Sequence, residues 1–291
     1  MTSETSSAIL RYTAFSSDPS GGNPAGVVLD ASGFDDARML AVAAEVGYSE
    51  TAFVTVRDAE RRRFAVRYFS PLAEVDFCGH ATVATAVALA ERVGPGELVF
   101  ETQVGEIPVA TAADADGVTR ATLTSVATDS HPVEDSVLDA ALAALGWQRS
   151  ELDPGLPPRV AFGGVWHLVL AVASRARLAD LSYDFDGLAG LMRARGWTTL
   201  QLVWQEAPGR FHSRNPFPVG GVVEDPATGA AAAAFGGYLR ALGRVPEGGE
   251  VVIRQGEDMG RPSTLTLAVD AADPRVRQRP GGLPRLTSLC P

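Results

Sequence analysis

The chain has 291 residues, of which 25 are basic and 35 acidic, and every basic residue is an arginine because the sequence contains no lysine. Without lysine the chain can form neither a Schiff base with pyridoxal phosphate or a substrate carbonyl nor a Walker A phosphate-binding loop. The formal net charge of −10 disfavours nucleic acid or an anionic membrane as the main partner.

The length predicts about two domains of ordinary globular composition. Residues 1–9 lack the basic and apolar regions of a signal peptide, and the longest apolar run, 81–90, is about half the length of a membrane span. The two cysteines, Cys78 and Cys290, are too few for a disulfide scaffold. We therefore expect a cytoplasmic protein with no membrane partner.

The first half of the chain is rich in strands and contains two helices. Strands are predicted where apolar segments lie between turn residues, at 10–15, 24–29, 51–56, 64–69, 97–102, 105–110 and 118–124. A helix is predicted over 35–46, where apolar residues recur at helical spacing before Gly47. A second helix starts within 78–82 and runs to about Val93; it is apolar on almost every face, so we expect it to be buried all round.

The second half repeats this plan after a linker predicted at 126–133, which gives domains 1–127 and 128–291. Helices are predicted at 134–145, 185–195 and 230–242, and strands at 159–173, 199–205, 209–213, 250–255 and 263–269. Gly79 and Gly229 each precede a helix of small residues, about half the chain length apart. This pattern predicts a duplicated domain.

The starts of these two helices are candidate anion sites. A helix has unpaired N–H groups in its first turn, and they attract a carboxylate. If the halves face each other, both helix starts could hold one small substrate. The alternative is that both glycines only permit tight packing of helix against strand.

Glu50 and His80 are candidate proton-transfer groups. Glu50 lies between a helix end and an apolar strand, where burial could raise its pKa into the range of a general base; otherwise it is a solvated loop carboxylate. His80 lies at a helix start, where the helix dipole would lower its pKa and favour a neutral imidazole. It is either a hydrogen-bond donor or proton shuttle, or a structural histidine.

Three further groups stand close to the helix starts. Asp76, like Glu74, precedes the first helix and is expected to cap it. Asp225 precedes the second helix, where it either caps that helix or acts as the partner acid/base. Cys78 could act as a thiol base, although the second helix start has no cysteine to complete a two-thiol racemase.

The sequence gives little support for a metal or a nucleotide. The four histidines, at positions 80, 131, 167 and 212, are scattered, and neither His-x-x-x-His nor Cys-x-x-Cys occurs. The glycine-rich run at 21–26 precedes a strand rather than a helix, so it is not a dinucleotide loop. We therefore expect no metal and no cofactor.

Five motifs are spread over about residues 9–270: Gly22-Asn23-Pro24, Ser49-Glu50-Thr51-Ala52-Phe53-Val54, Glu74-Val75-Asp76-Phe77-Cys78-Gly79-His80-Ala81-Thr82, Glu224-Asp225-Pro226-Ala227-Thr228-Gly229, and Gln255-Gly256 with Met259-Gly260-Arg261-Pro262-Ser263. In these motifs and their order the chain resembles the phenazine-biosynthesis isomerase (PhzF-like) family of the diaminopimelate-epimerase-like superfamily.

This resemblance implies an α+β fold of two similar domains, each a β-sheet rolled around a central α-helix, with the active site in the interdomain cleft. It implies a cofactor-independent isomerase, usually a homodimer, that acts on a small carboxylate-bearing substrate. The best-known member acts on a dihydro-hydroxyanthranilate. By this resemblance Glu50 transfers the proton, and His80 and Asp225 assist.

The substrate-binding residues expected from these motifs are Asn23, Asp76, Gly79, Thr228, Gly229 and Ala230. The family often has serine after the Thr-Gly pair, so Ala230 removes a hydroxyl while leaving the backbone N–H. Two alternatives stay open. One is a racemase, epimerase or dehydratase of the same superfamily that uses Cys78, and the other is a small-molecule binding protein that has lost catalysis.

Overall fold

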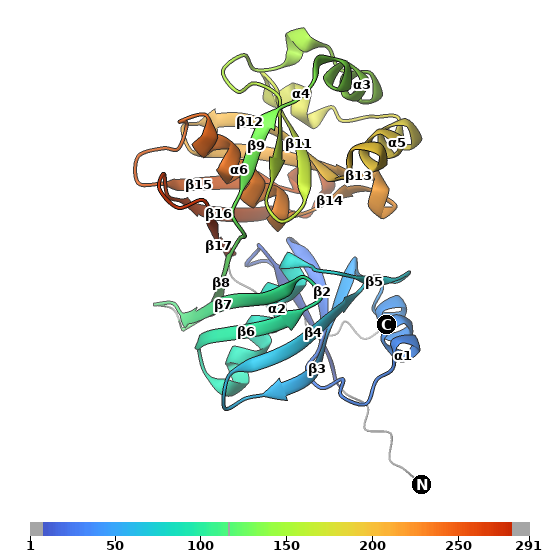
Figure 1. Ribbon diagram of the computed structural model, residues 1–291, viewed down its shortest axis with the longest axis vertical. Coiled ribbons are helices and arrows are strands. Elements are labelled where there is room, and N and C mark those ends of the chain that lie inside the picture. Colours follow the sequence, from blue (N-terminus) through green and yellow to red (C-terminus); the bar gives the residue numbers. More distant parts are fainter. Residues whose placement is uncertain (1–7, 116, 281–291) are drawn as a thin grey trace. The chain divides into compact units, whose positions relative to one another are not determined.

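The computed structural model describes residues 8–115 and 117–280, and the chain forms two compact units (Figure 1). Of the described residues, the N-terminal unit contains those up to Leu123 together with Pro280, and the C-terminal unit comprises Thr124–Arg279. The expectations for residues 1–7 and for Cys290 lie outside the described residues. Among the helices that are described, none combines the length and the apolar character of a membrane span.

The N-terminal unit is a mixed sheet wrapped around one helix. Its strands are β1 (Ile9–Ala14), β2 (Asn23–Val28), β3 (Glu50–Asp58), β4 (Arg63–Phe69), β5 (Glu74–Val75), β6 (Gly96–Thr102), β7 (Gly105–Ala113) and β8 (Thr119–Thr124). Pairing is parallel for β2 with β3 and for β4 with β6, and antiparallel for the other neighbours in this unit. Helix α1 (Asp36–Val46) connects the parallel pair β2 and β3.

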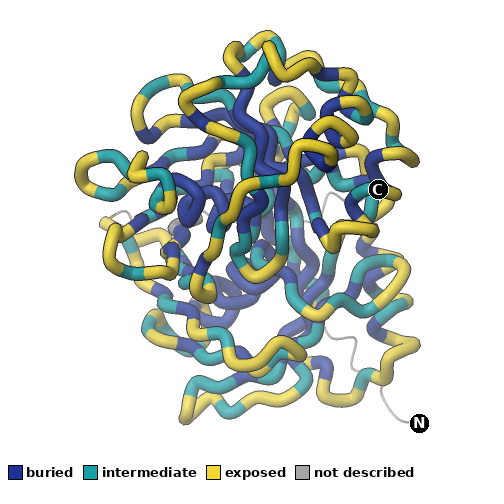
Figure 2. The backbone as a smooth tube through the Cα atoms, turned by 45° about the horizontal axis from the view of Figure 1, so that its top comes forward, coloured by how far each residue is buried: buried dark blue, intermediate teal, exposed yellow. Residues whose placement is uncertain are grey.

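The central helix of this unit is α2 (Gly79–Val93). Residues 80–90 of α2 are all buried, as its apolar character on every face predicts. Figure 2 shows the contrast between such buried segments and the exposed turns that connect them. Helix α1 instead buries one stripe, begins at Asp35, whose side chain accepts from the Arg38 N–H, and ends at Gly47 in the left-handed conformation.

The C-terminal unit has the same plan with extra helices. Its strands are β9 (Asp129–Pro132), β10 (Arg159–Phe162), β11 (Trp166–Ala171), β12 (Trp197–Ala207), β13 (Arg210–Phe217), β14 (Val222–Asp225), β15 (Glu250–Gln255), β16 (Ser263–Val269) and β17 (Val276–Pro280). Its helices are α3 (Asp135–Leu145), α4 (Arg175–Ala179), α5 (Phe185–Arg195) and α6 (Gly229–Ala241), and short 3-10 turns lie at Arg149–Glu151, Pro218–Gly220 and Glu257–Met259. Helix α6 is buried against one face of the sheet, whereas α3 and α5 cover a separate apolar core on the other.

An equivalent ion pair in each unit supports the predicted duplication. In the N-terminal unit Arg67 of β4 binds Glu74 of β5 at 2.6 Å, and in the C-terminal unit Arg214 of β13 binds Glu224 of β14 at 2.5 Å. Each glutamate stands five positions before the glycine that begins the central helix. The predicted fold of two similar α+β domains is thereby confirmed.

Most predicted elements are present, with three differences. The predicted linker contains β9, which pairs antiparallel with β10, because this short segment completes the edge of the sheet. The predicted strand at 159–173 is two strands, β10 and β11, joined by a turn at Gly163 and Gly164. Helix α4 and strands β5, β14 and β17 were not predicted, since all are five residues or shorter.

Candidate functional site

Glu50, Cys78 and His80 form a cluster in the N-terminal unit, here called the Glu50 cluster. Glu50 begins β3, Cys78 precedes α2, and His80 is in the first turn of α2, which packs on β3. His80 Nε2 lies 3.4 Å from Glu50 Oε2, and Cys78 Sγ lies 3.2 Å from His80 Nδ1. The hydroxyl of Ser49 is also 3.4 Å from His80 Nε2. The structure thus brings a carboxylate, an imidazole and a thiol together.

Burial favours the neutral form of the His80 imidazole. His80 is 7% exposed, and its burial lowers its pKa, although the Glu50 carboxylate and a hydrogen bond with the Pro24 backbone act in the opposite direction. The sequence predicted this direction from the helix dipole, but burial is the main cause. The side chain of Glu50 keeps 18% of its surface exposed, so this carboxylate is the accessible member of the pair.

No side chain of the N-cap residue caps the first turn of α2. This corrects the expectation that Asp76 or Glu74 caps this helix. Cys78 is the N-cap residue, and its side chain makes no capping hydrogen bond. Asp76 is exposed, and Glu74 is engaged by the guanidinium of Arg67, so neither carboxylate caps α2 as expected. Helix α2 therefore presents backbone N–H groups at Gly79 and His80.

Asp225 and Thr228 form a second polar group at the start of α6 in the C-terminal unit. The Thr228 hydroxyl donates to Asp225 Oδ2 at 2.5 Å. The side-chain amide of Gln255, on β15, binds the backbone of residues 225–228 at two points. Its Nε2 donates to the Asp225 carbonyl at 2.8 Å, and its Oε1 accepts from the Thr228 N–H at 3.2 Å. Thr228, not Asp225, is the N-cap residue, so the capping interpretation of Asp225 is wrong.

Gln255 was not predicted as a site residue, although it belongs to one of the motifs. Its amide bridges two residues that lie far upstream in the sequence, which spacing alone does not reveal. The start of α6 also involves the Gly229 carbonyl, which accepts from Gln278 Nε2. Ala230 follows in the first turn, and the N-cap residue Thr228 provides no side-chain cap.

Asn23 lies at the start of β2, 1% exposed and opposite Ala14 of β1. The turn before it requires Gly22, which has a φ of +67°. A Cβ atom at this position would come within 2.3 Å of the Ala14 carbonyl oxygen. The Gly-Asn-Pro motif therefore has a local structural cause.

The duplication identifies the positions in the C-terminal unit that match the Glu50 cluster. Counting along paired strands from the two Arg–Glu ion pairs places Thr199 at the position of Glu50. Counting forward from the same glutamates places Thr228 at the position of Cys78 and Ala230 at that of His80. The proton-transfer groups are therefore not repeated in the second unit.

A buried polar network surrounds Thr199 instead. His167 Nδ1 lies 2.9 Å from Thr199 Oγ1, and Asn215 Nδ2 donates to Gln201 Oε1 at 2.8 Å. Burial lowers the pKa of His167 to about 4. Four buried atoms of this region have no hydrogen-bond partner within the described chain: His167 Nε2, Gln201 Nε2, Ser213 Oγ and Asn215 Oδ1.

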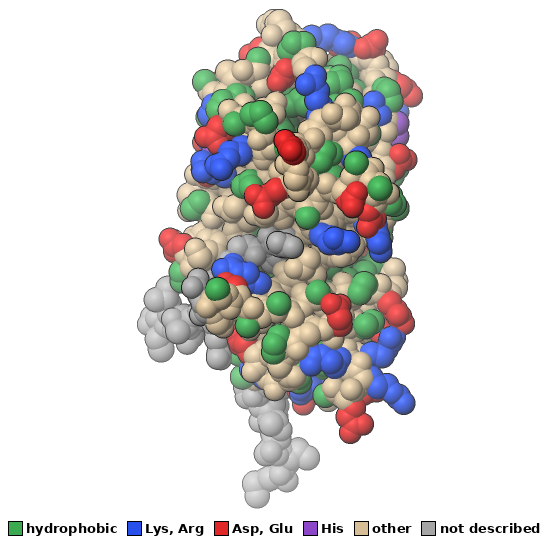
Figure 3. All heavy atoms as spheres, turned by 90° about the vertical axis from the view of Figure 1, so that its left-hand side faces the viewer, with side chains coloured by type: hydrophobic (Ala, Val, Ile, Leu, Met, Phe, Trp, Pro, Cys, Tyr) green, Lys and Arg blue, Asp and Glu red, His purple; other side chains and the backbone are tan. Residues whose placement is uncertain are grey.

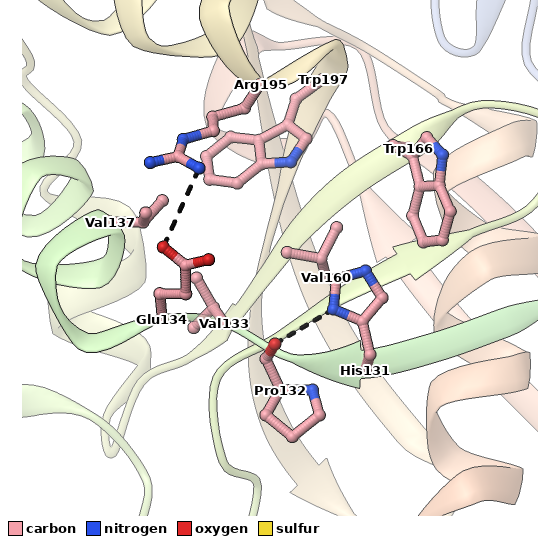
Figure 4. Close-up of a pocket in the computed structure, with 9 residues that line it drawn as sticks. All are labelled: His131, Pro132, Val133, Glu134, Val137, Val160, Trp166, Arg195 and Trp197. Atoms are coloured by element: carbon pink, nitrogen blue, oxygen red, sulfur yellow. Dashed lines mark hydrogen bonds and ion pairs between the residues drawn. The ribbon is translucent and has the colours of Figure 1, made fainter.

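A separate cavity of about 330 Å³ lies on the α3 and α5 side of the same unit (Figure 4). Two tryptophans, Trp166 and Trp197, line it together with His131, and an Arg195–Glu134 ion pair spans 4.0 Å at its edge. None of the predicted site residues lines this cavity. On the face of the molecule in Figure 3, acidic and basic side chains are interspersed.

Comparison with known proteins assigns the family. The model of the phenazine biosynthesis-like proteins (PhzC-PhzF) matches residues 12–280. The chain belongs to this family. An uncharacterized isomerase from Deinococcus radiodurans is 36% identical over 270 residues, which cover 90% of this chain and 87% of the relative. The trans-2,3-dihydro-3-hydroxyanthranilate isomerase of Pseudomonas aeruginosa is 32% identical over 265 residues, 90% of each chain.

The PhzF-like assignment also agrees with a solved structure. The crystal structure of the Bacillus anthracis phenazine biosynthesis protein of the PhzF family matches with a TM-score of 0.82 and 25% identity, over 96% of both chains. The predicted resemblance and fold class are thus confirmed. Because the named relatives are isomerases, this PhzF-like chain is an enzyme of the isomerase class.

Proposed function

We propose that this protein moves a proton within a small, carboxylate-bearing substrate, with Glu50 as the group that removes the proton and returns it at another carbon. The observation that carries this proposal is the Glu50 cluster, in which an accessible carboxylate lies 3.4 Å from a buried, neutral imidazole. A carboxylate alternates between base and acid during one turnover, which is the requirement for a proton shift.

The partners of Glu50 follow from the same geometry. We assign His80 to orienting the substrate or Glu50, because a neutral imidazole donates one hydrogen bond and accepts another. The uncapped N–H groups at Gly79 and His80, and those at Gly229 and Ala230, are suited to a substrate carboxylate.

The proposal extends to Asp225 and to the residues that bind the substrate. We assign Asp225 to assisting proton transfer or charge stabilisation, and Asn23, Asp76 and Thr228 to substrate binding.

The proposal includes no cofactor, since carboxylate and imidazole suffice to move a proton at an activated carbon. The relative from Pseudomonas aeruginosa is named for a dihydro-hydroxyanthranilate, a small cyclic amino acid. We propose a substrate of this class. Ala230 lacks a hydroxyl often present in the family, so the substrate is expected to differ in the group that this hydroxyl would contact. We further propose a homodimer, on the ground of the family resemblance, and a cytoplasmic location, on the ground of the low cysteine content.

The test is proton NMR in D₂O with a panel of small amino and hydroxy acids, in which both deuterium incorporation and product formation are followed. Glu50→Gln should abolish turnover and keep binding, because the amide cannot accept the proton. Glu45→Gln is the matched control, since this exposed glutamate lies on α1 outside the cluster. A Glu50→Gln enzyme with full activity would exclude the assignment.

The second candidate function is that of a racemase, epimerase or dehydratase that uses the Cys78 thiol. The observation in favour of this function is the distance of 3.2 Å between Cys78 Sγ and His80 Nδ1. Cys78→Ser separates the two functions. Turnover that survives this change supports Glu50 as the base, whereas turnover that is lost with the fold intact supports the thiol. Substrate binding without product across the whole panel would instead indicate a binding protein.

A further inference from the structure

The cavity on the α3 and α5 side of the C-terminal unit has a charged end and an aromatic end (Figure 4). Arg195 and Glu134 lie at the charged end. The rings of Trp166 and His131 lie at the other end, with Val160 between the two. We propose that this cavity binds an aromatic α-amino acid. The carboxylate of the ligand binds Arg195, its ammonium group binds Glu134, and its ring lies beside Trp166.

The cavity lies where α3 begins and α5 ends, so the apolar layer between these helices and the sheet meets solvent there. Its floor comes from paired strands. Val160 on β10 stands opposite His131 on β9, and Trp166 on β11 has Trp197 on β12 as its neighbour. The volume of about 330 Å³ is at the low end of the range for small-molecule sites, about 300–1,000 Å³, and therefore suits a ligand of amino-acid size.

The aromatic end is suited to a flat ring. The ring centroids of Trp166 and His131 are 5.2 Å apart, and their planes are inclined by 57°. Phe162 extends this group, with its centroid 5.0 Å from that of Trp166. A further ring can join such a group in an offset or edge-to-face arrangement. Trp166 is only partly buried, so part of its indole surface is available to a ligand.

The charged end carries two groups of opposite sign that are not hydrogen-bonded to each other. Arg195 Nη1 lies 4.0 Å from Glu134 Oε2, which is beyond hydrogen-bond distance. Within the described chain, each of these groups has only the other as an ion-pair partner. Glu134 is the N-cap residue of α3, but its side chain makes no capping hydrogen bond. Both groups can therefore bind a ligand.

Two opposite charges at this spacing favour a zwitterion. An α-amino acid carries its ammonium and carboxylate groups on one carbon atom, so both groups can reach partners that lie 4.0 Å apart. A ligand with a carboxylate alone would bring a second anion beside Glu134, and a ligand with an amine alone would bring a second cation beside Arg195. Such like-charge contacts oppose binding.

The binding test uses L-phenylalanine, which does not absorb at the excitation wavelength of tryptophan. Tryptophan fluorescence and calorimetry of the full-length protein should give a Kd of about 1 mM or lower. Phenylpropanoate lacks the ammonium group, phenethylamine lacks the carboxylate, and L-alanine lacks the ring. Each should bind about tenfold more weakly. Equal affinity for any of these three, or no binding of L-phenylalanine up to about 10 mM, would overturn the proposal.

Variants test whether the ligand is in the cavity. Arg195→Gln should weaken L-phenylalanine binding about tenfold without weakening phenethylamine, which has no carboxylate. Arg193→Gln is the matched control, because this exposed arginine lies in the same helix turn and does not line the cavity. Trp166→Ala should weaken every ligand that carries a ring.

Circular dichroism confirms that each variant is folded. The Arg195–Glu134 pair is exposed, so its loss should cost little stability, and Arg195→Gln decides the question if Trp166→Ala unfolds. L-phenylalanine affinity unchanged in Arg195→Gln would overturn the proposal.

Glu50→Gln separates this site from the proposed active site, since none of the predicted site residues lines the cavity. This variant should bind L-phenylalanine with wild-type affinity, whether or not the wild-type protein turns over a substrate of the panel. Binding that is lost in Glu50→Gln and kept in Arg195→Gln would assign the ligand to the Glu50 cluster and overturn the assignment to the cavity.

Discussion

His167 should make the C-terminal unit lose stability in mild acid. Its ring is fully buried, and Nδ1 donates to Thr199, whose carbonyl oxygen lies at 3.2 Å and can only accept. Nε2 has no partner in the described chain. Protonation would place a second N–H at this unpartnered position, which is the physical reason that burial lowers the pKa of His167 to about 4.

The direction and the size of this stability change follow from the pKa of His167 in the unfolded chain and in the folded chain. The unfolded chain takes up this proton near pH 6.5 and the folded chain only near pH 4, so the contribution of the neutral ring is complete above 6.5 and declines as pH falls toward 4. The whole shift corresponds to about 3 kcal/mol of unfolding free energy, and about 2 kcal/mol of it should be lost between about pH 7 and pH 5.

The assay is urea unfolding followed by tryptophan fluorescence, because all four tryptophans lie in the C-terminal unit. His167→Asn keeps a donor for Thr199 and removes the titrating ring, and the difference between wild type and variant cancels the titration of other groups. This difference should shrink by about 2 kcal/mol from about pH 7 to pH 5. His131→Asn, a change at an exposed histidine, is the control. A difference that is constant with pH would refute the reasoning.

Four further substitutions test other contacts. Arg214→Met should lower the free energy of unfolding by about 3–5 kcal/mol, because it leaves the Glu224 carboxylate, which is 3% exposed, without its cation. Arg67→Met, at the equivalent but more exposed pair with Glu74, should lower it by only about 1 kcal/mol. Equal losses for the two variants in urea unfolding would contradict this difference. Gly163→Ala should destabilise by about 1–3 kcal/mol, because its Cβ would lie 2.4 Å from a carbonyl of α6, and an unchanged unfolding midpoint would count against this packing. Thr228→Val removes the 2.5 Å hydrogen bond to Asp225 and should lower kcat/KM about tenfold or more; steady-state kinetics with unchanged kcat/KM would exclude a role for this contact.

The fold was largely predictable because its helices have distinct patterns. Helix α2 is apolar on almost every face, and this property alone predicts a helix that is buried all round. Strand β9 was missed because a four-residue strand containing His131 and Pro132 resembles a linker in composition. Its identity as a strand comes from pairing with β10, a partner that local sequence does not specify.

The candidate site was predictable only in part. Motifs singled out Glu50, His80 and Asp225, but the contacts that give these residues their properties join different elements. Glu50 begins β3, whereas Cys78 and His80 stand at the start of α2, so local spacing could not show that these three side chains meet. The network around His167 was missed for a related reason: the register of β11, β12 and β13 decides which polar side chains meet, and a shift of one residue would reverse their faces.

The duplicated architecture has consequences for the chemistry that each unit can perform. A symmetric pair of bases would require a counterpart of Glu50 or Cys78 in the C-terminal unit, and Thr199 and Thr228 stand at those positions. Neither hydroxyl is a base near neutral pH. The proposed reaction therefore depends on one carboxylate that removes and returns the same proton, with Asp225 in an assisting role. In D₂O, product should then form with less than one deuterium per turnover, because part of the proton on Glu50 returns before it exchanges with solvent. Complete deuterium incorporation at the first turnover would show that exchange outpaces return or that a second group delivers the proton.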